Sequence, residues 1–160
     1  MEKLNIICID DQRYILASLR KDLEEFSKYC IINSCESAEE AESLIDDLYF
    51  DDEPIALVIC DHVMPGKNGV DFLIELTDDA RFPTLRKILV TGMATHQDTI
   101  LAINRAHIDC YIEKPWSKSE LTTAVRSLLG QFISQSKMDL ENYPSLFNDE
   151  NIESGFPKVI

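Results

Sequence analysis

Short apolar runs rich in Ile, Val and Cys recur at intervals along most of the chain. Three of these runs are almost unbroken, which is typical of strands covered on both faces and therefore of a parallel sheet. The pattern predicts five strands, at residues 4–9, 30–34, 55–60, 87–90 and 110–112.

Segments with the apolar spacing of amphipathic helices lie after each of these runs. Two of them begin with a helix-capping signal, because Ser37 stands three residues before Glu40 and Ser117 three residues before Glu120. Strict alternation of strands and helices predicts an α/β fold with a doubly wound parallel sheet of five strands and five helices. The expected helical segments lie within residues 14–26, 38–48, 70–76, 100–106 and 121–132.

Polar side chains follow four of the five predicted strands. Asp10 and Asp11 come after the first strand, Asp61 after the third, Thr91 after the fourth and Lys114 after the fifth. In an open α/β sheet, ligands bind beyond the carboxyl ends of the strands. We therefore expect these five residues to form one site.

The predicted site would hold three carboxylates, which repel one another unless a cation neutralises them. Mg²⁺ suits such a site, because it takes oxygen ligands and leaves coordination positions open for phosphate oxygens. A carboxylate can also attack phosphorus to form an aspartyl phosphate, and Lys114 and the Thr91 hydroxyl can then neutralise and bind the phosphoryl oxygens. Each residue alone is better explained as a helix cap, a turn residue or a solvated loop charge, so the inference depends on the whole set.

Charge and cysteine content narrow the class of protein. The chain has 29 acidic and 15 basic residues and a net charge of −14, which predicts no direct binding to nucleic acid or to an anionic membrane surface. Its five cysteines show no Cys-x-x-Cys spacing and are expected to be reduced core residues of a cytoplasmic protein. The apolar stretch at residues 4–9 is too short for a signal peptide or a membrane span.

The regular pattern weakens near the C-terminus. We expect one domain over residues 1–132 and a tail or linker over residues 133–160, in which Tyr143, Phe147 and Phe156 are isolated aromatics. The composition favours a mobile terminus, and the alternative is an arm whose aromatics dock on the domain or on a second copy of the chain.

Four motifs in this order give the chain a resemblance to a known family: Ile-Asp-Asp at 9–11, Cys-Asp-His-Val-Met-Pro-Gly-Lys-Asn-Gly at 60–69, Leu-Val-Thr-Gly at 89–92 and Tyr-Ile-Glu-Lys-Pro-Trp at 111–116. From about residue 3 to residue 132, the chain resembles the receiver domains of bacterial two-component response regulators. The resemblance implies a flavodoxin-like sheet with strand order 2-1-3-4-5.

The resemblance also implies a role for each residue of the acidic site. Asp61 would be the phosphoacceptor, and Mg²⁺ would be held directly by Asp11, Asp61 and the main-chain carbonyl of Val63, and by Asp10 through water. His62, beside the acceptor, is interpreted as a loop residue rather than a phosphodonor, because no separate His-bearing dimerisation helix is evident.

The remaining implied roles concern signalling. Thr91 and Lys114 would bind the phosphoryl oxygens, and Tyr111 would turn inward when Thr91 is drawn toward the phosphoryl group. The fourth helix, fifth strand and fifth helix would form the output face, where a homodimer is possible. The implied partners are a sensor histidine kinase or phosphotransfer protein and a downstream protein target.

Two alternatives stay open. A phosphatase of the haloacid-dehalogenase type also uses an Asp nucleophile, Mg²⁺, Thr and Lys, but its first strand ends in two Asp residues separated by one position, whereas Asp10 and Asp11 are adjacent. A receiver-like interaction module that no longer takes phosphate is the second alternative, and the intact set of Asp61, Thr91 and Lys114 argues against it. The favoured interpretation is a switch that catalyses only its own phosphorylation and dephosphorylation, and not an enzyme.

Overall fold

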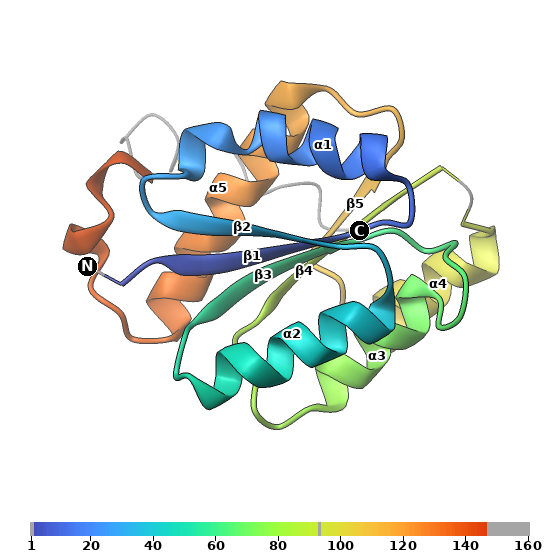
Figure 1. The fold of residues 1–160 in the computed structure, drawn as a ribbon, viewed down its shortest axis with the longest axis horizontal. Coiled ribbons are helices and arrows are strands. Elements are labelled where there is room, and N and C mark those ends of the chain that lie inside the picture. Colours follow the sequence, from blue (N-terminus) through green and yellow to red (C-terminus); the bar gives the residue numbers. More distant parts are fainter. Residues whose placement is uncertain (1, 93, 147–160) are drawn as a thin grey trace.

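A computed structural model describes residues 2–92 and 94–146 and contains a five-stranded parallel sheet (Figure 1). The strand order is β2-β1-β3-β4-β5, and every neighbouring pair is parallel. This confirms the predicted α/β fold and its strand order. The strands are β1 (Leu4–Ile9), β2 (Cys30–Cys35), β3 (Ile55–Cys60), β4 (Arg86–Thr91) and β5 (Cys110–Glu113).

Helices cover both faces of the sheet. In Figure 1, α1 and α5 lie on one side, and α2, α3 and α4 lie on the other. The helices are α1 (Arg13–Asp22), α2 (Ala38–Phe50), α3 (Gly69–Asp78), α4 (His96–Asn104) and α5 (Lys118–Gln135).

The central strands β1 and β3 are apolar except at the buried Asn5, because successive side chains face one of two cores. In β1, Leu4, Ile6 and Cys8 belong to the core under α1 and α5, while Ile7 and Ile9 belong to the core under the other three helices. All six residues of β1 and all six of β3 are buried. The unbroken apolar runs in the sequence follow from this two-sided burial.

Local capping sets where several helices begin. The side chains of Ser37 and Ser117 accept hydrogen bonds from the backbone N–H groups of Glu40 and Glu120, as the sequence predicts. Helix α4 begins earlier than its apolar spacing indicated, because Thr95 and Asp98 form a reciprocal capping box.

Helix α5 runs through the predicted division between residues 132 and 133, and the chain beyond it returns to the domain. Tyr143 is 1% exposed, packs edge-on against Tyr29 with ring centroids 5.8 Å apart, and donates a hydrogen bond to the Glu2 carbonyl at 2.7 Å. As far as residue 146, the chain beyond α5 therefore packs against the domain. This is the alternative to the mobile terminus that the composition favoured. Phe147 and Phe156 lie outside the described residues.

Among the helices that the structure describes, none is both long enough and apolar enough to cross a bilayer.

Candidate phosphoryl-acceptor site

The carboxyl ends of three strands bring a lysine between two aspartates. Lys114, directly after β5, places its Nζ 2.7 Å from Asp10 Oδ2 and 3.3 Å from Asp61 Oδ2. Asp10 follows β1 and Asp61 follows β3, and both residues are buried. The sequence places these residues at the same edge of the sheet, and the structure brings their charged atoms together.

A third carboxylate completes an acidic cluster. One oxygen from each of Asp10, Asp11 and Asp61 lies within 4.8 Å of the others, with Asp11 exposed to solvent. Three carboxylates against the single ammonium of Lys114 leave an excess of negative charge. Oxygen donors in this number fit Mg²⁺, which binds one or two carboxylates and completes its shell with water or phosphate oxygens.

Burial and charge shift the protonation equilibria of this cluster. Burial raises the pKa of Asp10, and repulsion from Asp61 adds to it, although hydrogen bonds from Lys114 and the Gln12 backbone act in the opposite direction. Burial acts to lower the pKa of Lys114, but the hydrogen bond to Asp10 and the charges of both aspartates outweigh it, so its pKa is raised. The lysine is therefore held in its charged form, while ionised Asp10 is costly without a further cation.

Backbone hydrogen bonds fix the orientation of both buried carboxylates. Asp10 Oδ1 accepts from the Gln12 N–H at 2.9 Å, and Asp61 Oδ1 accepts from the His62 N–H at 2.8 Å. The backbone N–H of Asp61 also donates to the Ile9 carbonyl at 2.9 Å, which extends the pairing of β1 and β3 to Asp61 itself. The carboxylates are thus positioned by the sheet and not by mobile loops.

The loop after β3 returns closely over Asp61. A Cβ atom at Gly69, the first residue of α3, would lie 1.8 Å from the Asp61 carbonyl oxygen and 2.7 Å from its carbonyl carbon. Gly66, in the same loop, has a φ of +81°, which glycine adopts without the strain of a side chain. Close approach at Gly69 therefore requires glycine.

The remaining predicted site residues lie around this cluster. Thr91 is the buried last residue of β4 and pairs in register with Glu113, immediately before Lys114. Tyr111 on β5 is half-buried, and its burial raises the pKa of its hydroxyl. Val63 lies in the loop after β3 with its side chain 46% exposed.

His62, next to Asp61, makes contacts that reasoning from the sequence did not predict. His62 is buried, and its Nδ1 accepts a hydrogen bond from the Val70 backbone N–H at 3.3 Å. Its Nε2 lies 3.1 Å from Asp98 Oδ2 on α4. The sequence signal was the position of His62 directly after a buried strand, but its partners on α3 and α4 cannot be read from spacing.

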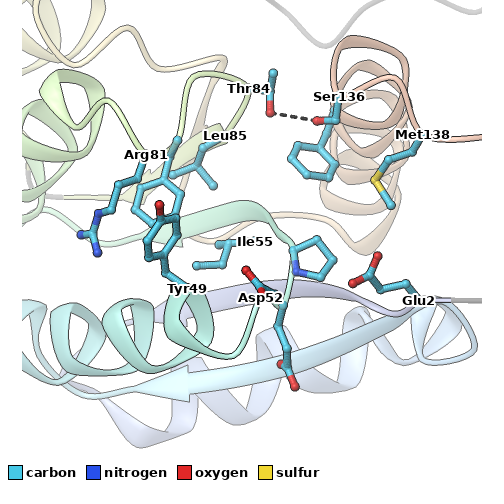
Figure 2. Close-up of a pocket in the computed structure, with 13 residues that line it drawn as sticks. Glu2, Tyr49, Asp52, Ile55, Arg81, Thr84, Leu85, Ser136 and Met138 are labelled. Atoms are coloured by element: carbon cyan, nitrogen blue, oxygen red, sulfur yellow. Dashed lines mark hydrogen bonds between the residues drawn. The ribbon is translucent and has the colours of Figure 1, made fainter.

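A separate hollow of about 340 Å³ lies at the opposite edge of the sheet, where β1 and β3 begin (Figure 2). Its lining includes Glu2, Ile55 and Arg81, and Thr84 and Ser136 form a hydrogen bond of 2.8 Å across one side of it. Ligands of open α/β sheets bind at the carboxyl ends of the strands, so we assign the chemistry to the acidic cluster instead.

Comparison with protein families gives a match over most of the chain. The sequence model described as the response regulator receiver domain matches residues 6–126. The chain is 30% identical over 143 residues to the hydrogenase transcriptional regulatory protein HoxA of Cupriavidus necator and 32% identical over 124 residues to the transcriptional regulatory protein CpxR of Escherichia coli K12. These matches cover 88% and 78% of this chain but 28% and 48% of the relatives, so it spans between about a quarter and a half of their length.

Two solved receiver-domain structures share the fold of this chain and about a quarter of its sequence. The signal receiver domain of an HD domain-containing protein from Pseudomonas fluorescens Pf-5 aligns with a TM-score of 0.76 and 26% identity, covering 86% of this chain and 94% of that one. A CheY-like response regulator receiver domain protein from Methanospirillum hungatei aligns with a TM-score of 0.72 and 25% identity, covering 84% of this chain and 99% of that one.

Proposed function

This chain belongs to the response regulator receiver domain family, and we propose that it is a switch phosphorylated on Asp61 with the help of Mg²⁺. The observation that carries the proposal is the position of Lys114 Nζ, within 3.3 Å of both Asp10 and Asp61 at the carboxyl edge of the sheet. This places a fixed positive charge beside a buried carboxylate, as an incoming phosphoryl group requires.

The proposed step is a single displacement at phosphorus. One oxygen of the Asp61 carboxylate attacks the phosphorus atom of the donor, and the new O–P bond forms as the bond from phosphorus to the leaving group breaks. The leaving group keeps the electron pair; it is the imidazole of a histidine kinase or phosphotransfer protein, or acetate when acetyl phosphate is the donor. In dephosphorylation, water attacks the same phosphorus atom, the bond from phosphorus to the Asp61 oxygen breaks, and the carboxylate and inorganic phosphate are released.

The acidic cluster supplies the proposed metal site. Asp10, Asp11, Asp61 and the main-chain carbonyl of Val63 would hold Mg²⁺, with Asp10 acting through water. When bound, Mg²⁺ would offset the repulsion between the carboxylates and the negative oxygens of the phosphoryl group. Support comes from the three converging carboxylate oxygens and from the burial of Asp10, which raises the pKa of its carboxyl and makes its ionised form costly unless a further cation is bound.

Phosphorylation would be transmitted through the residues beside the site. Lys114 and the Thr91 hydroxyl would bind phosphoryl oxygens, and movement of Thr91 toward them would let the half-buried Tyr111 turn inward. The output face would then be α4, β5 and α5. Ile100 and Leu101 on α4 are 43% and 41% exposed, and this apolar surface suits a homodimer or a downstream protein partner.

The proposed partners are proteins. A sensor histidine kinase or phosphotransfer protein would supply the phosphoryl group, and we place this exchange in the cytoplasm. The net charge of −14 opposes direct contact with nucleic acid or with anionic lipid. Two relatives are named as transcriptional regulatory proteins, and this chain spans only part of their length, so a connection to transcription would depend on protein contacts or on further domains.

The test is the intact mass of the protein after incubation with acetyl phosphate and Mg²⁺. We expect a gain of one phosphoryl group in the wild type and no gain in Asp61→Asn or in the presence of EDTA. No gain in wild-type protein that binds Mg²⁺ would favour a phosphate-independent interaction module. Sustained turnover of a small phosphate ester would instead favour the phosphatase alternative.

A further inference from the structure

His62 joins the acceptor to the first turns of two helices. Its backbone N–H donates to Asp61 Oδ1 at 2.8 Å, and its imidazole lies between Val70 on α3 and Asp98 on α4. Because Nδ1 accepts from the Val70 N–H, the imidazole proton lies on Nε2 and is donated to Asp98 Oδ2, 3.1 Å away. One buried residue therefore makes a backbone contact with the phosphoacceptor and a side-chain contact with each helix.

The contact with α4 is made at the group that caps this helix. Asp98 Oδ2 also accepts from the Thr95 N–H at 3.0 Å, and the Thr95 side chain accepts from the Asp98 N–H at 3.1 Å. The His62 contact is additional to this capping box and ties the capped end of α4 to the core. Without it, the capping turn is held only by its own two hydrogen bonds and is expected to open more often.

Helix α4 has little other attachment to the core. All nine of its residues are described, and among them only Ala102 is fully buried. Ile100 and Leu101 are more than two-fifths exposed. A single polar contact at the N-terminus is therefore a substantial part of what holds this helix in place.

We propose that His62 is a positioning residue that couples the state of Asp61 to the docking of α4. The proposal rests on the proposed function, because it takes phosphorylation as the event that changes Asp61. Phosphorylation turns the carboxylate into an acyl phosphate and weakens Asp61 as an acceptor for the His62 N–H, because the carboxyl group loses the charge that strengthens this hydrogen bond. The rigid, buried imidazole carries the resulting shift of the His62 backbone to Asp98.

The chain offers substitutions that separate the two imidazole contacts. In His62→Asn the shorter amide keeps a polar atom near the Nδ1 position, so it can still accept from Val70, but it cannot reach Asp98. In His62→Gln the amide nitrogen reaches the Nε2 position and restores a donor to Asp98. His96→Asn is the matched control, because His96 is an exposed residue in the first turn of the same helix.

The first measurement is amide hydrogen exchange of the unphosphorylated protein. We expect the Thr95 and Asp98 amides to exchange about tenfold faster in His62→Asn, the change that loss of one hydrogen bond to a charged group allows. His62→Gln and His96→Asn should stay within about twofold of the wild type. Exchange in His62→Asn that matches the wild type at both amides would overturn the proposal.

A double substitution tests the His62–Asp98 contact directly. Asp98→Asn weakens both the Thr95 capping bond and the acceptor for His62, so we expect it to speed exchange at Thr95 by about threefold in the wild type. In His62→Asn the contact with Asp98 is already absent, so Asp98→Asn should add a smaller effect there. An equal added effect in both backgrounds would overturn the proposal.

The coupling itself is measured with acetyl phosphate and Mg²⁺. We expect phosphorylation to change exchange at the Thr95 and Asp98 amides of the wild type, and to leave them unchanged in His62→Asn that gains the same phosphoryl mass. An equal response in both proteins would overturn the coupling. Absence of phosphoryl mass in the wild type would instead overturn the proposed function, and the two exchange comparisons on unphosphorylated protein would still decide whether His62 docks α4.

Discussion

Gly69→Ala gives the sharpest structural prediction, because the Gly69 backbone lies so close to the backbone of Asp61. The added Cβ would lie 1.8 Å from the Asp61 carbonyl oxygen, far below the 3.0 Å that real Cβ contacts almost never cross. It would also lie 3.0 Å from His62 Cα. Both neighbours are backbone, so no side-chain rotation relieves the clash. Either α3 or the acceptor strand end must move.

The expected change in the free energy of unfolding of Gly69→Ala follows from two opposed effects. Alanine is favoured over glycine within a helix by about 1 kcal/mol, less in the first turn, while forcing an atom into a filled site costs about 1–3 kcal/mol and sometimes more. Because this overlap involves backbone atoms only, we expect a net loss of about 3 kcal/mol in the free energy of unfolding. For a chain of this size, that is a fall in Tm of roughly 6–12 °C.

Gly92→Ala is the matched control at the same site. Its Cβ would lie 3.6 Å from Lys114 Cβ, an ordinary van der Waals distance, so we expect a change within about 0.5 kcal/mol. Urea unfolding of both variants measures the difference, and intact mass after acetyl phosphate measures uptake. Equal stability of the two variants would refute the reasoning. Because the clash forces α3 or the end of β3 to move, we also expect Gly69→Ala to take up less phosphoryl group than Gly92→Ala, and full uptake by a destabilised Gly69→Ala protein would contradict this.

Three further outcomes are expected. Asp10→Asn should raise the urea midpoint in EDTA at neutral pH, because burial raises the folded-state pKa of Asp10 and its ionised form therefore costs stability. The difference from the wild type should shrink as the pH falls through that pKa. A difference that stays constant with pH would contradict this. At a hundred times its Kd, Mg²⁺ should raise the free energy of unfolding of the wild type by about 2.7 kcal/mol, and its urea midpoint accordingly. The rise should be smaller in Asp61→Asn. Tyr143→Phe should lose about 1 kcal/mol with its hydrogen bond to Glu2, whereas Tyr14→Phe, at a side chain 68% exposed, should change little.

The sheet and the acidic cluster were predictable because their signals are local. The central strands β1 and β3 are buried on both faces, so their residues form almost unbroken apolar runs, and the polar residue that follows each run must lie at the carboxyl edge. Parallel pairing then brings Asp10, Asp61 and Lys114 together whatever the details of the loops between them.

The contacts made by loops and by the C-terminal arm were not predictable in this way. The imidazole of His62 binds Asp98, 36 positions along the chain, and neither residue belongs to an alternating pattern that reports burial. Tyr143 was visible as an isolated aromatic, but composition favoured a mobile terminus because its partners, Tyr29 and Glu2, lie more than 110 residues earlier. Such contacts depend on how elements pack in three dimensions and not on the sequence period.

The most direct test of the central claim is to trap the phosphorylated carboxylate chemically. Borohydride reduces an acyl phosphate to the alcohol, so protein treated with acetyl phosphate and Mg²⁺ and then with borohydride should carry homoserine in place of the modified aspartate. Peptide mass analysis should place homoserine at position 61, with none when EDTA replaces Mg²⁺. Homoserine at position 10 or 11, or at no aspartate of a protein that had gained phosphoryl mass, would contradict the assignment of Asp61 as the acceptor.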